Sequence, residues 1–148
     1  MEDKSQELMK VGDIVPRETR FVNAGITITE LAKIMELQYC NVLLVGNKYR
    51  ASGIITQRDI VTRVIAQGKD PYQTLIGDVM SKDIFTCSAN DNLEVVLSKM
   101  HEKRVSNLAV RNNLDKVTTI VSLKDIIANI SCADMQTGCL VPYLRSIV

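Results

Sequence analysis

The sequence has no tryptophan, a single histidine, and only 4% aromatic residues over its 148 positions. Single-stranded nucleic acid is usually held on aromatic platforms, and a net charge of +1 provides no broad basic surface. No apolar run approaches the roughly 20 residues that cross a bilayer, and the start, MEDKSQELMK, is too polar for a secretory signal. We therefore expect a cytoplasmic protein with neither membrane nor nucleic acid as a partner.

Cysteine motifs of the metal-binding kind are also missing. The four cysteines, Cys40, Cys87, Cys132 and Cys139, form no CxxC pair, whereas a structural zinc site needs four clustered ligands. We expect free thiols that pack as small apolar residues, and no metal or cofactor. A disulfide between Cys132 and Cys139 is the alternative if the source is a hyperthermophile.

Catalytic constellations are absent as well. The sole histidine, His101, follows Met100 inside a predicted amphipathic helix, and no nucleophile stands with a base and an orienting group. Hydrophobic residues at 46% and charged residues at 24% indicate a globular protein. The length suits one ordinary domain or two small ones packed together. We expect a binding protein rather than an enzyme.

An internal repeat organises the chain. The segment VGDIV at 11–15 returns as IGDVM at 76–80, which is an offset of 65 residues. The same offset relates two helical patterns of apolar residues at i, i+3, i+4 and i+7, and then the strands 42–45 and 107–110. The offset becomes 66 where GIITQRD at 53–59 matches TIVSLKD at 119–125. One residue inserted in the second hairpin loop explains that change.

Each repeat reads as β-α-β-β-α. The predicted strands are 20–23, 42–45 and 51–55, with copies at 84–87, 107–110 and 117–121. The first helix of each copy is 28–38 or 93–103, and it buries Ile28, Leu31, Ala32 and Met35, or Leu93, Val96, Leu97 and Met100. The second helix, at about 57–67, buries Ile60, Val61, Val64 and Ile65, and its copy buries Ile126, Ile127 and Ile130.

The expected fold is therefore mixed α/β, two repeats packed about an approximate two-fold axis, because one unit of this size buries too little surface alone. We divide the chain into an extension at 1–9, a first domain at 10–70, a second domain at 75–131, and a tail at 132–148. The axis leaves two related clefts between the domains, where a ligand is expected.

One motif occurs in both repeats at the start of the second helix. Thr56 precedes Asp59 by three positions, and Ser122 precedes Asp125 by the same spacing. Either pair alone is explained by helix capping, since the hydroxyl and the carboxylate both stabilise a helix N-terminus. The same free N–H groups can instead bind a phosphate, with the carboxylate accepting hydrogen bonds from ribose hydroxyls. Positive charge stands nearby at Arg58, Lys124 and Arg104, although surface arginines and lysines are as often simply solvated.

These segments resemble the G-h-x-T/S-x-x-D/N signature of cystathionine-beta-synthase-type (CBS) domains. The VGDIV and IGDVM openings and the strand Ser106–Val110 are also similar to the family, and the likeness spans about residues 10–131. Two positions of the second repeat depart from the pattern: Thr119 stands at the motif's glycine and Ala109 at its usual proline. We expect the Cβ of Thr119 to crowd the backbone's approach to a ligand.

The resemblance implies two sites, each shared between the domains. The first would use Thr56 and Asp59 with Arg58, and would take Asp78, Ile84, Arg104, Val105 and Ser106 from the other domain. The second would use Ser122 and Asp125 with Asp13, Cys40 and Asn41. Because of the departure at Thr119, we expect the first site to be the better formed.

The resemblance also implies a function. A pair of CBS domains would be a regulatory module, here without a fused effector domain, that binds AMP, ADP, ATP or an S-adenosylmethionine-type ligand. It would form a homodimer, with the helices 28–38 and 93–103 or the tail 139–148 supplying the contact, and would act on a partner protein. The alternative is an interaction or assembly module whose clefts stay empty.

Overall fold

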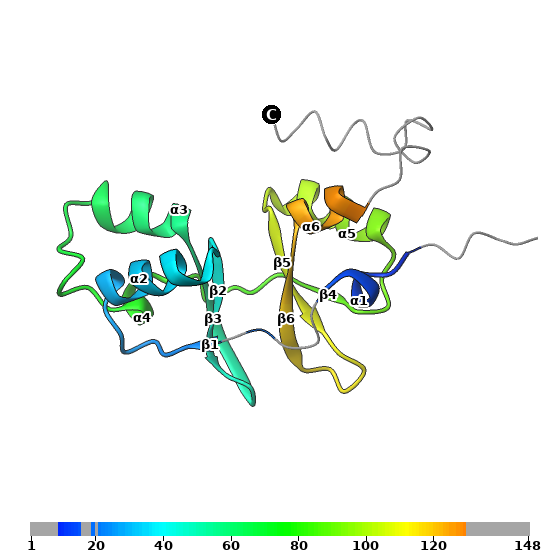
Figure 1. The fold of residues 1–148 in the computed structure, drawn as a ribbon, viewed down its shortest axis with the longest axis horizontal. Coiled ribbons are helices and arrows are strands. Elements are labelled where there is room, and N and C mark those ends of the chain that lie inside the picture. The colour runs from blue at the N-terminus through cyan, green and yellow to red at the C-terminus, as the bar shows by residue number, and fades with distance from the viewer. Residues whose placement is uncertain (1–8, 16–18, 20, 130–148) are drawn as a thin grey trace, which may run out of the picture.

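Two three-stranded sheets stand side by side at the centre of the molecule (Figure 1). The computed structural model describes residues 9–15, 19 and 21–129, and all that follows concerns these residues. The first sheet contains β1 (Phe21–Val22), β2 (Val42–Asn47) and β3 (Arg50–Thr56), and the second β4 (Thr86–Ser88), β5 (Asn107–Arg111) and β6 (Val117–Ser122). In each sheet the first strand is parallel to the second, which pairs antiparallel with the third. The predicted β-α-β-β-α order and the mixed α/β class are confirmed.

The first helix of each repeat has the predicted bounds, α2 (Ile28–Gln38) and α5 (Leu93–Lys103). At the start of α2, Glu30 N–H donates to Thr27 Oγ1 at 3.2 Å and Thr27 N–H donates to Glu30 Oε2 at 2.8 Å. Both helices end at a residue in the left-handed conformation, Tyr39 (φ 50°) and Arg104 (φ 55°). The predicted apolar faces are buried except for Ala32, which is exposed.

The second helix of the first repeat differs from the single α-helix predicted. It begins as α3 (Gln57–Asp59) and continues as a π-helix, η1 (Ile60–Ile65), in which Ala66 N–H donates to Val61 O five residues back, at 2.9 Å. Only the side that carries Ile60 and Val64 packs on the core, so Val61 and Ile65 remain 59% and 58% exposed. The prediction that both are buried was wrong.

The copy of this helix is α6 (Leu123–Asn129). Its Ile126 is buried as predicted, whereas Ile127 is 42% exposed, and Ile130 lies outside the described residues. In both repeats the helix therefore turns part of its predicted apolar face outward. No helix of the described ranges has both the length and the apolar character needed to traverse a bilayer.

Two short helices each pack on the core of the repeat to which they do not belong in sequence. They are labelled α1 (blue, on the right) and α4 (green, on the left) in Figure 1. The helix α1 (Val11–Ile14) precedes the first sheet in sequence but buries Val11 in the core of the second repeat. Conversely, α4 (Ile76–Val79) precedes the second sheet but buries Ile76 and Val79 in the core of the first. The backbone contacts are equivalent, since Gly12 N–H donates to Ala89 O at 2.8 Å and Gly77 N–H donates to Ala24 O at 2.9 Å.

The segment after α4 connects the two repeats by pairing with β3. Ile54 N–H donates to Ser81 O at 2.9 Å, and Ser81 N–H donates back to Ile54 O at 3.0 Å. Gly53 makes this approach feasible, because a Cβ there would lie 2.6 Å from Met80 Sδ and 2.9 Å from Ser81 O. The motif's glycine thus admits the connecting backbone.

Candidate functional site

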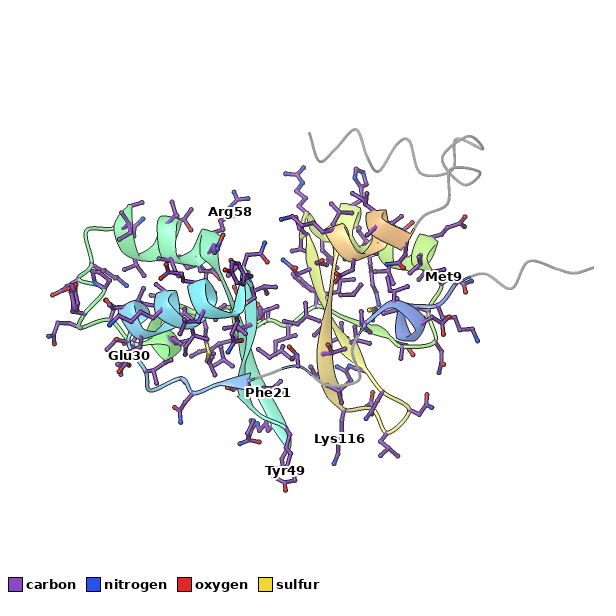
Figure 2. All side chains as sticks on the ribbon, viewed as in Figure 1. Met9, Phe21, Glu30, Tyr49, Arg58 and Lys116 are labelled. Carbon is purple, nitrogen blue, oxygen red and sulfur yellow. The ribbon has the colours of Figure 1, made fainter. Side chains whose placement is uncertain are left out.

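A cleft of about 720 Å³ lies between the repeats. Its first wall is the end of β3 with α3 and η1, and its second wall is the segment 104–107 that joins α5 to β5. Ser81 and Asp83 of the connecting segment also line it, and Phe85 follows them. Figure 2 places Arg58 at the upper edge of this region, on the side of the first repeat that faces the second.

Thr56 and Asp59 form a closed hydrogen-bonded unit in this cleft. Thr56 N–H and Thr56 Oγ1 both donate to Asp59 Oδ2, at 2.9 and 3.0 Å, and Asp59 N–H donates to Thr56 Oγ1 at 3.2 Å. The predicted capping role is therefore real. Asp59 is only 9% exposed, so its carboxylate is fixed in the cleft wall with its Oδ1 atom left for other partners.

Arg63 holds that second oxygen. Its Nε atom lies 3.5 Å from Asp59 Oδ1, and its Nη1 donates to Val79 O at 2.9 Å. Arg63 was not predicted as a site residue, although its position four residues after Asp59, on the same helical face, was a usable signal. A ligand hydroxyl that bonds to Asp59 must share Oδ1 with this guanidinium.

Two further arginines face the cleft from opposite walls. Arg58 comes from α3, and Arg104 from the left-handed residue that ends α5. Within the described part of the chain neither of them forms an ion pair. Both are therefore available to an anionic group placed between the repeats.

Three of the residues predicted for the second wall line the cleft, namely Arg104, Val105 and Ser106. Asp78 and Ile84 do not line it. Asp78 is exposed on α4, which packs on the first core, and Ile84 is half-buried between two residues in sequence that do line the cleft, Asp83 and Phe85. Phe85 is 41% exposed, with Lys103 Nζ 5.4 Å from its ring centre. The pairing of Ser81 with Ile54 of β3 brings Asp83 and Phe85 to the cleft. No sequence motif marks either residue.

The residues predicted for a second site lie in separate surroundings. Ser122 and Asp125 repeat the capping bonds, with Ser122 N–H donating to Asp125 Oδ2 at 2.9 Å and Asp125 N–H to Ser122 Oγ at 3.1 Å. Of their expected partners, Asn41 lines the first cleft, Cys40 packs against the first core, and Asp13 lines a different pocket on the second repeat. The second motif is thus seen here as a helix cap.

Both cysteines in the described ranges are free thiols. Burial raises the pKa of Cys40 above its ordinary value, and it raises the pKa of Cys87 to about 11, with the nearby charge of Asp91 acting in the same direction. Neither thiol is activated as a nucleophile. Cys132 and Cys139 lie outside the described residues.

Comparisons with known proteins agree with this architecture. The CBS-domain model matches residues 11–66 and 76–132. An uncharacterised protein of Methanopyrus kandleri is 29% identical over 120 residues, which cover 80% of this chain and 61% of that protein. The chain spans smaller shares of several other relatives, down to 14% of a Schizosaccharomyces pombe protein.

Solved structures are similar over most of the chain. A CBS-domain protein of unknown function from Thermoplasma acidophilum superposes with a TM-score of 0.77 and 25% identity, covering 93% of this chain and 77% of that one. The CBS-domain pair of protein MJ0100, in complex with 5′-methylthioadenosine and S-adenosyl-L-methionine, gives a TM-score of 0.72 and 27% identity, covering 82% of this chain and 94% of that one.

Proposed function

The chain belongs to the CBS-domain family, and from this premise we propose that its inter-repeat cleft binds an adenosine-containing regulatory ligand. The observation that carries the proposal is the cleft itself. It brings the Thr56–Asp59 unit to face Arg104 and Phe85 of the other repeat. The complex of the related MJ0100 pair with two adenosine compounds supports the ligand class.

Each part of such a ligand has a matching group. Asp59 Oδ1 can accept a hydrogen bond from a ribose hydroxyl, and Arg58 and Arg104 supply charge for a phosphate. The exposed ring of Phe85 and the side chain of Val105 offer apolar surface for the base. AMP, ADP and ATP use all three parts, whereas S-adenosylmethionine would use two.

Calorimetric titration of the full chain with adenosine, AMP, ADP, ATP and S-adenosylmethionine tests the proposal. We expect micromolar binding of at least one of them, weakened at least about tenfold in Asp59→Ala. The matched control is Asp125→Ala, which removes the equivalent cap from the second repeat and should leave the affinity unchanged. Equal losses in both variants would show that the effect is one of folding, and the absence of binding by every compound would reject the proposal.

The arginines are tested through the phosphate. In Arg58→Gln and Arg104→Gln we expect AMP or ATP to bind about tenfold more weakly, because each variant removes a charge-assisted hydrogen bond, while adenosine binds as before. If adenosine loses as much affinity as AMP, the arginines do not contact a phosphate.

A second candidate, an assembly module, is favoured by apolar side chains on the helices. Val61 and Ile65 of η1 and Ile127 of α6 occupy equivalent helices of the two repeats and are more than 40% exposed. Related surfaces on both repeats suit an isologous contact with a second copy. We propose that such a module would form a homodimer through these helices, different from the helices 28–38 and 93–103 expected from the sequence. Light scattering should show a dimer in the wild type and a monomer in Val61→Glu.

The two free thiols agree with a reducing compartment, so a cytoplasmic location belongs to the same proposal. The regulated partner protein would read the arrangement of the two repeats, which the cleft ligand contacts on both sides. Regulation by binding, without catalysis, is the activity we infer.

A further inference from the structure

A second pocket, of about 500 Å³, lies on the second repeat and is separate from the inter-repeat cleft. It is bounded by α1, by the turn at Ala89 and Asn90, and by the hairpin that joins β5 to β6. No residue lines both cavities. The two cavities are therefore distinct.

Comparison of the repeats explains why the pocket exists. In the first repeat the thioether of Met80 fills the space beside Gly53, since a Cβ there would lie 2.6 Å from its sulfur. In the second core the equivalent positions are held by Val15, which follows the exchanged helix α1, and by Thr119 of β6. Both residues line the pocket. Val15 is shorter than Met80, so a hollow remains. Where Gly53 has only a hydrogen atom, Thr119 has a side chain with a hydroxyl group.

Within the residues that the structure describes, that hydroxyl is without a hydrogen-bond partner. Thr119 is 2% exposed, and its Oγ1 atom makes no hydrogen bond within the described part of the chain. A buried hydroxyl without a partner is destabilising, and most buried polar groups in folded proteins are satisfied. Because Thr119 lines the adjoining pocket, rotation of its side chain would present this atom to a polar ligand there.

The other lining groups indicate the chemistry of that ligand. Asn112 Oδ1 already accepts the N–H groups of Leu114 and Lys116, at 2.9 and 3.1 Å, and Asn113 Oδ1 accepts from Asn90 Nδ2 at 3.0 Å. Asn112 Oδ1 is thus fully occupied and Asn113 Oδ1 is partly occupied, whereas the NH₂ groups of both asparagines are donors that the pocket can offer to a ligand. Donors of this kind suit a carboxylate.

The opposite end of the pocket supplies one charge of each sign. Asp13 Oδ2 accepts the N–H of Lys10 at 3.0 Å, which leaves Asp13 Oδ1 for a ligand, and the Lys10 side chain adds a cation. The lining is therefore neutral overall but polarised, with NH₂ and ammonium donors together with one carboxylate oxygen. Val15, Ala89 and Val110 provide a small apolar floor.

We propose that this pocket binds a free amino acid. Its carboxylate would accept from the asparagine NH₂ groups and Lys10, its ammonium would donate to Asp13, and a polar atom would satisfy Thr119 Oγ1. A zwitterion matches a pocket with one cation and one anion better than a phosphate or a hydrocarbon does.

Two-dimensional ¹H–¹⁵N NMR of the full chain, titrated with each common L-amino acid to about 10 mM, tests the proposal, because even millimolar binding saturates there. We expect at least one amino acid to shift the side-chain NH₂ signals of Asn112 and Asn113 saturably. Asp59→Ala should give the same shifts, which separates this pocket from the inter-repeat cleft. If no amino acid shifts these signals, or if ribose or inorganic phosphate does so instead, the proposal is rejected.

Two variants test the named contacts. Thr119→Val preserves shape and removes the unpartnered hydroxyl, so we expect a higher Tm without ligand and about tenfold weaker amino-acid binding. Asn113→Asp, at an exposed position, replaces an NH₂ donor by a charge that repels a carboxylate, and binding should be lost while the Tm changes little. Unchanged affinity in both variants would overturn the assignment.

Discussion

The Nε atom of Arg63 lies 3.5 Å from Oδ1 of Asp59, the one carboxylate oxygen that the Thr56 cap leaves free. The first turn of the helix is therefore capped through Oδ2 and closed by an ion pair through Oδ1. Any ribose hydroxyl that bonds to Asp59 competes with that ion pair. If the proposed ligand binds there, breaking this ion pair would reduce its affinity.

Removing the competitor should favour a ligand that depends on ribose alone. An i, i+4 pair of partly exposed charges contributes about 0.3–0.5 kcal/mol, so we expect Arg63→Met to bind adenosine about twofold more tightly by calorimetry. Arg50→Met, at an exposed site of the β2–β3 hairpin, is the control and should bind as the wild type does. A tenfold weaker affinity in Arg63→Met would mean that the guanidinium itself contacts the ligand.

Giving the first repeat the threonine of the second should disturb the connecting segment. A side chain at Gly53 would collide with Met80 Sδ and Ser81 O, and we expect Gly53→Thr to lower the free energy of unfolding by about 1–3 kcal/mol in urea. Ser52→Thr, at the exposed neighbouring position, should change it by less than about 0.5 kcal/mol. A wild-type midpoint for Gly53→Thr would show that the segment docks without needing the glycine.

The packing of α4 on the first core predicts which sheet loses stability when α4 is altered. Ile76 is fully buried in the first core, so Ile76→Ala should cost about 2–5 kcal/mol. Amide hydrogen exchange should accelerate first in β2 and β3 and less in β5 and β6, although Ile76 belongs in sequence to the second repeat. Asp78→Ala on the same helix is the matched control, because Asp78 is exposed and should change stability by under about 0.5 kcal/mol. Faster exchange confined to the second sheet would contradict the exchange of helices.

Cys87 predicts a loss of stability at alkaline pH. Its pKa is about 11 in the folded protein against 9.0 ordinarily, so between these values the unfolded chain releases a proton that the folded chain retains. The free energy of unfolding contributed by this thiol is intact below pH 9 and falls as the pH rises toward 11. Urea titrations at several pH values should show a smaller fall over this window in Cys87→Ala than in the wild type. Identical slopes would mean that Cys87 does not titrate as described.

The regular elements could be predicted because their causes are local. The Thr27–Glu30 capping box and the apolar period fix α2, and Gly68, with φ +67°, follows the second helix at a position that suits glycine. The exposure of Val61 and Ile65 was missed because periodicity shows that a face is apolar but not whether another element covers it. The π-helical geometry of η1 has no signature that we could recognise in the sequence.

The site was predictable only where a motif marks it. Thr56 and Asp59 carry the signature and line the cleft, whereas Asp83 and Phe85 reach it through the backbone pairing of Ser81 with Ile54. Asp78 was misplaced because the repeat shows that two segments are alike but not which core each one joins. At Thr119 we expected the Cβ to crowd a ligand. The equivalent Gly53 instead faces protein atoms, those of Met80 and Ser81.

The exchange of α1 and α4 has a consequence for the order in which the chain folds. During synthesis the first sheet is complete before α4 emerges, so its core stays open to solvent until Ile76 arrives. Val11 is made early but contacts α6, one of the last described elements, and must wait for it. Neither repeat can close by itself, and contacts between such distant segments slow folding. A ribosome-bound chain that stops before α4 should therefore be open to proteases, although its first sheet is complete.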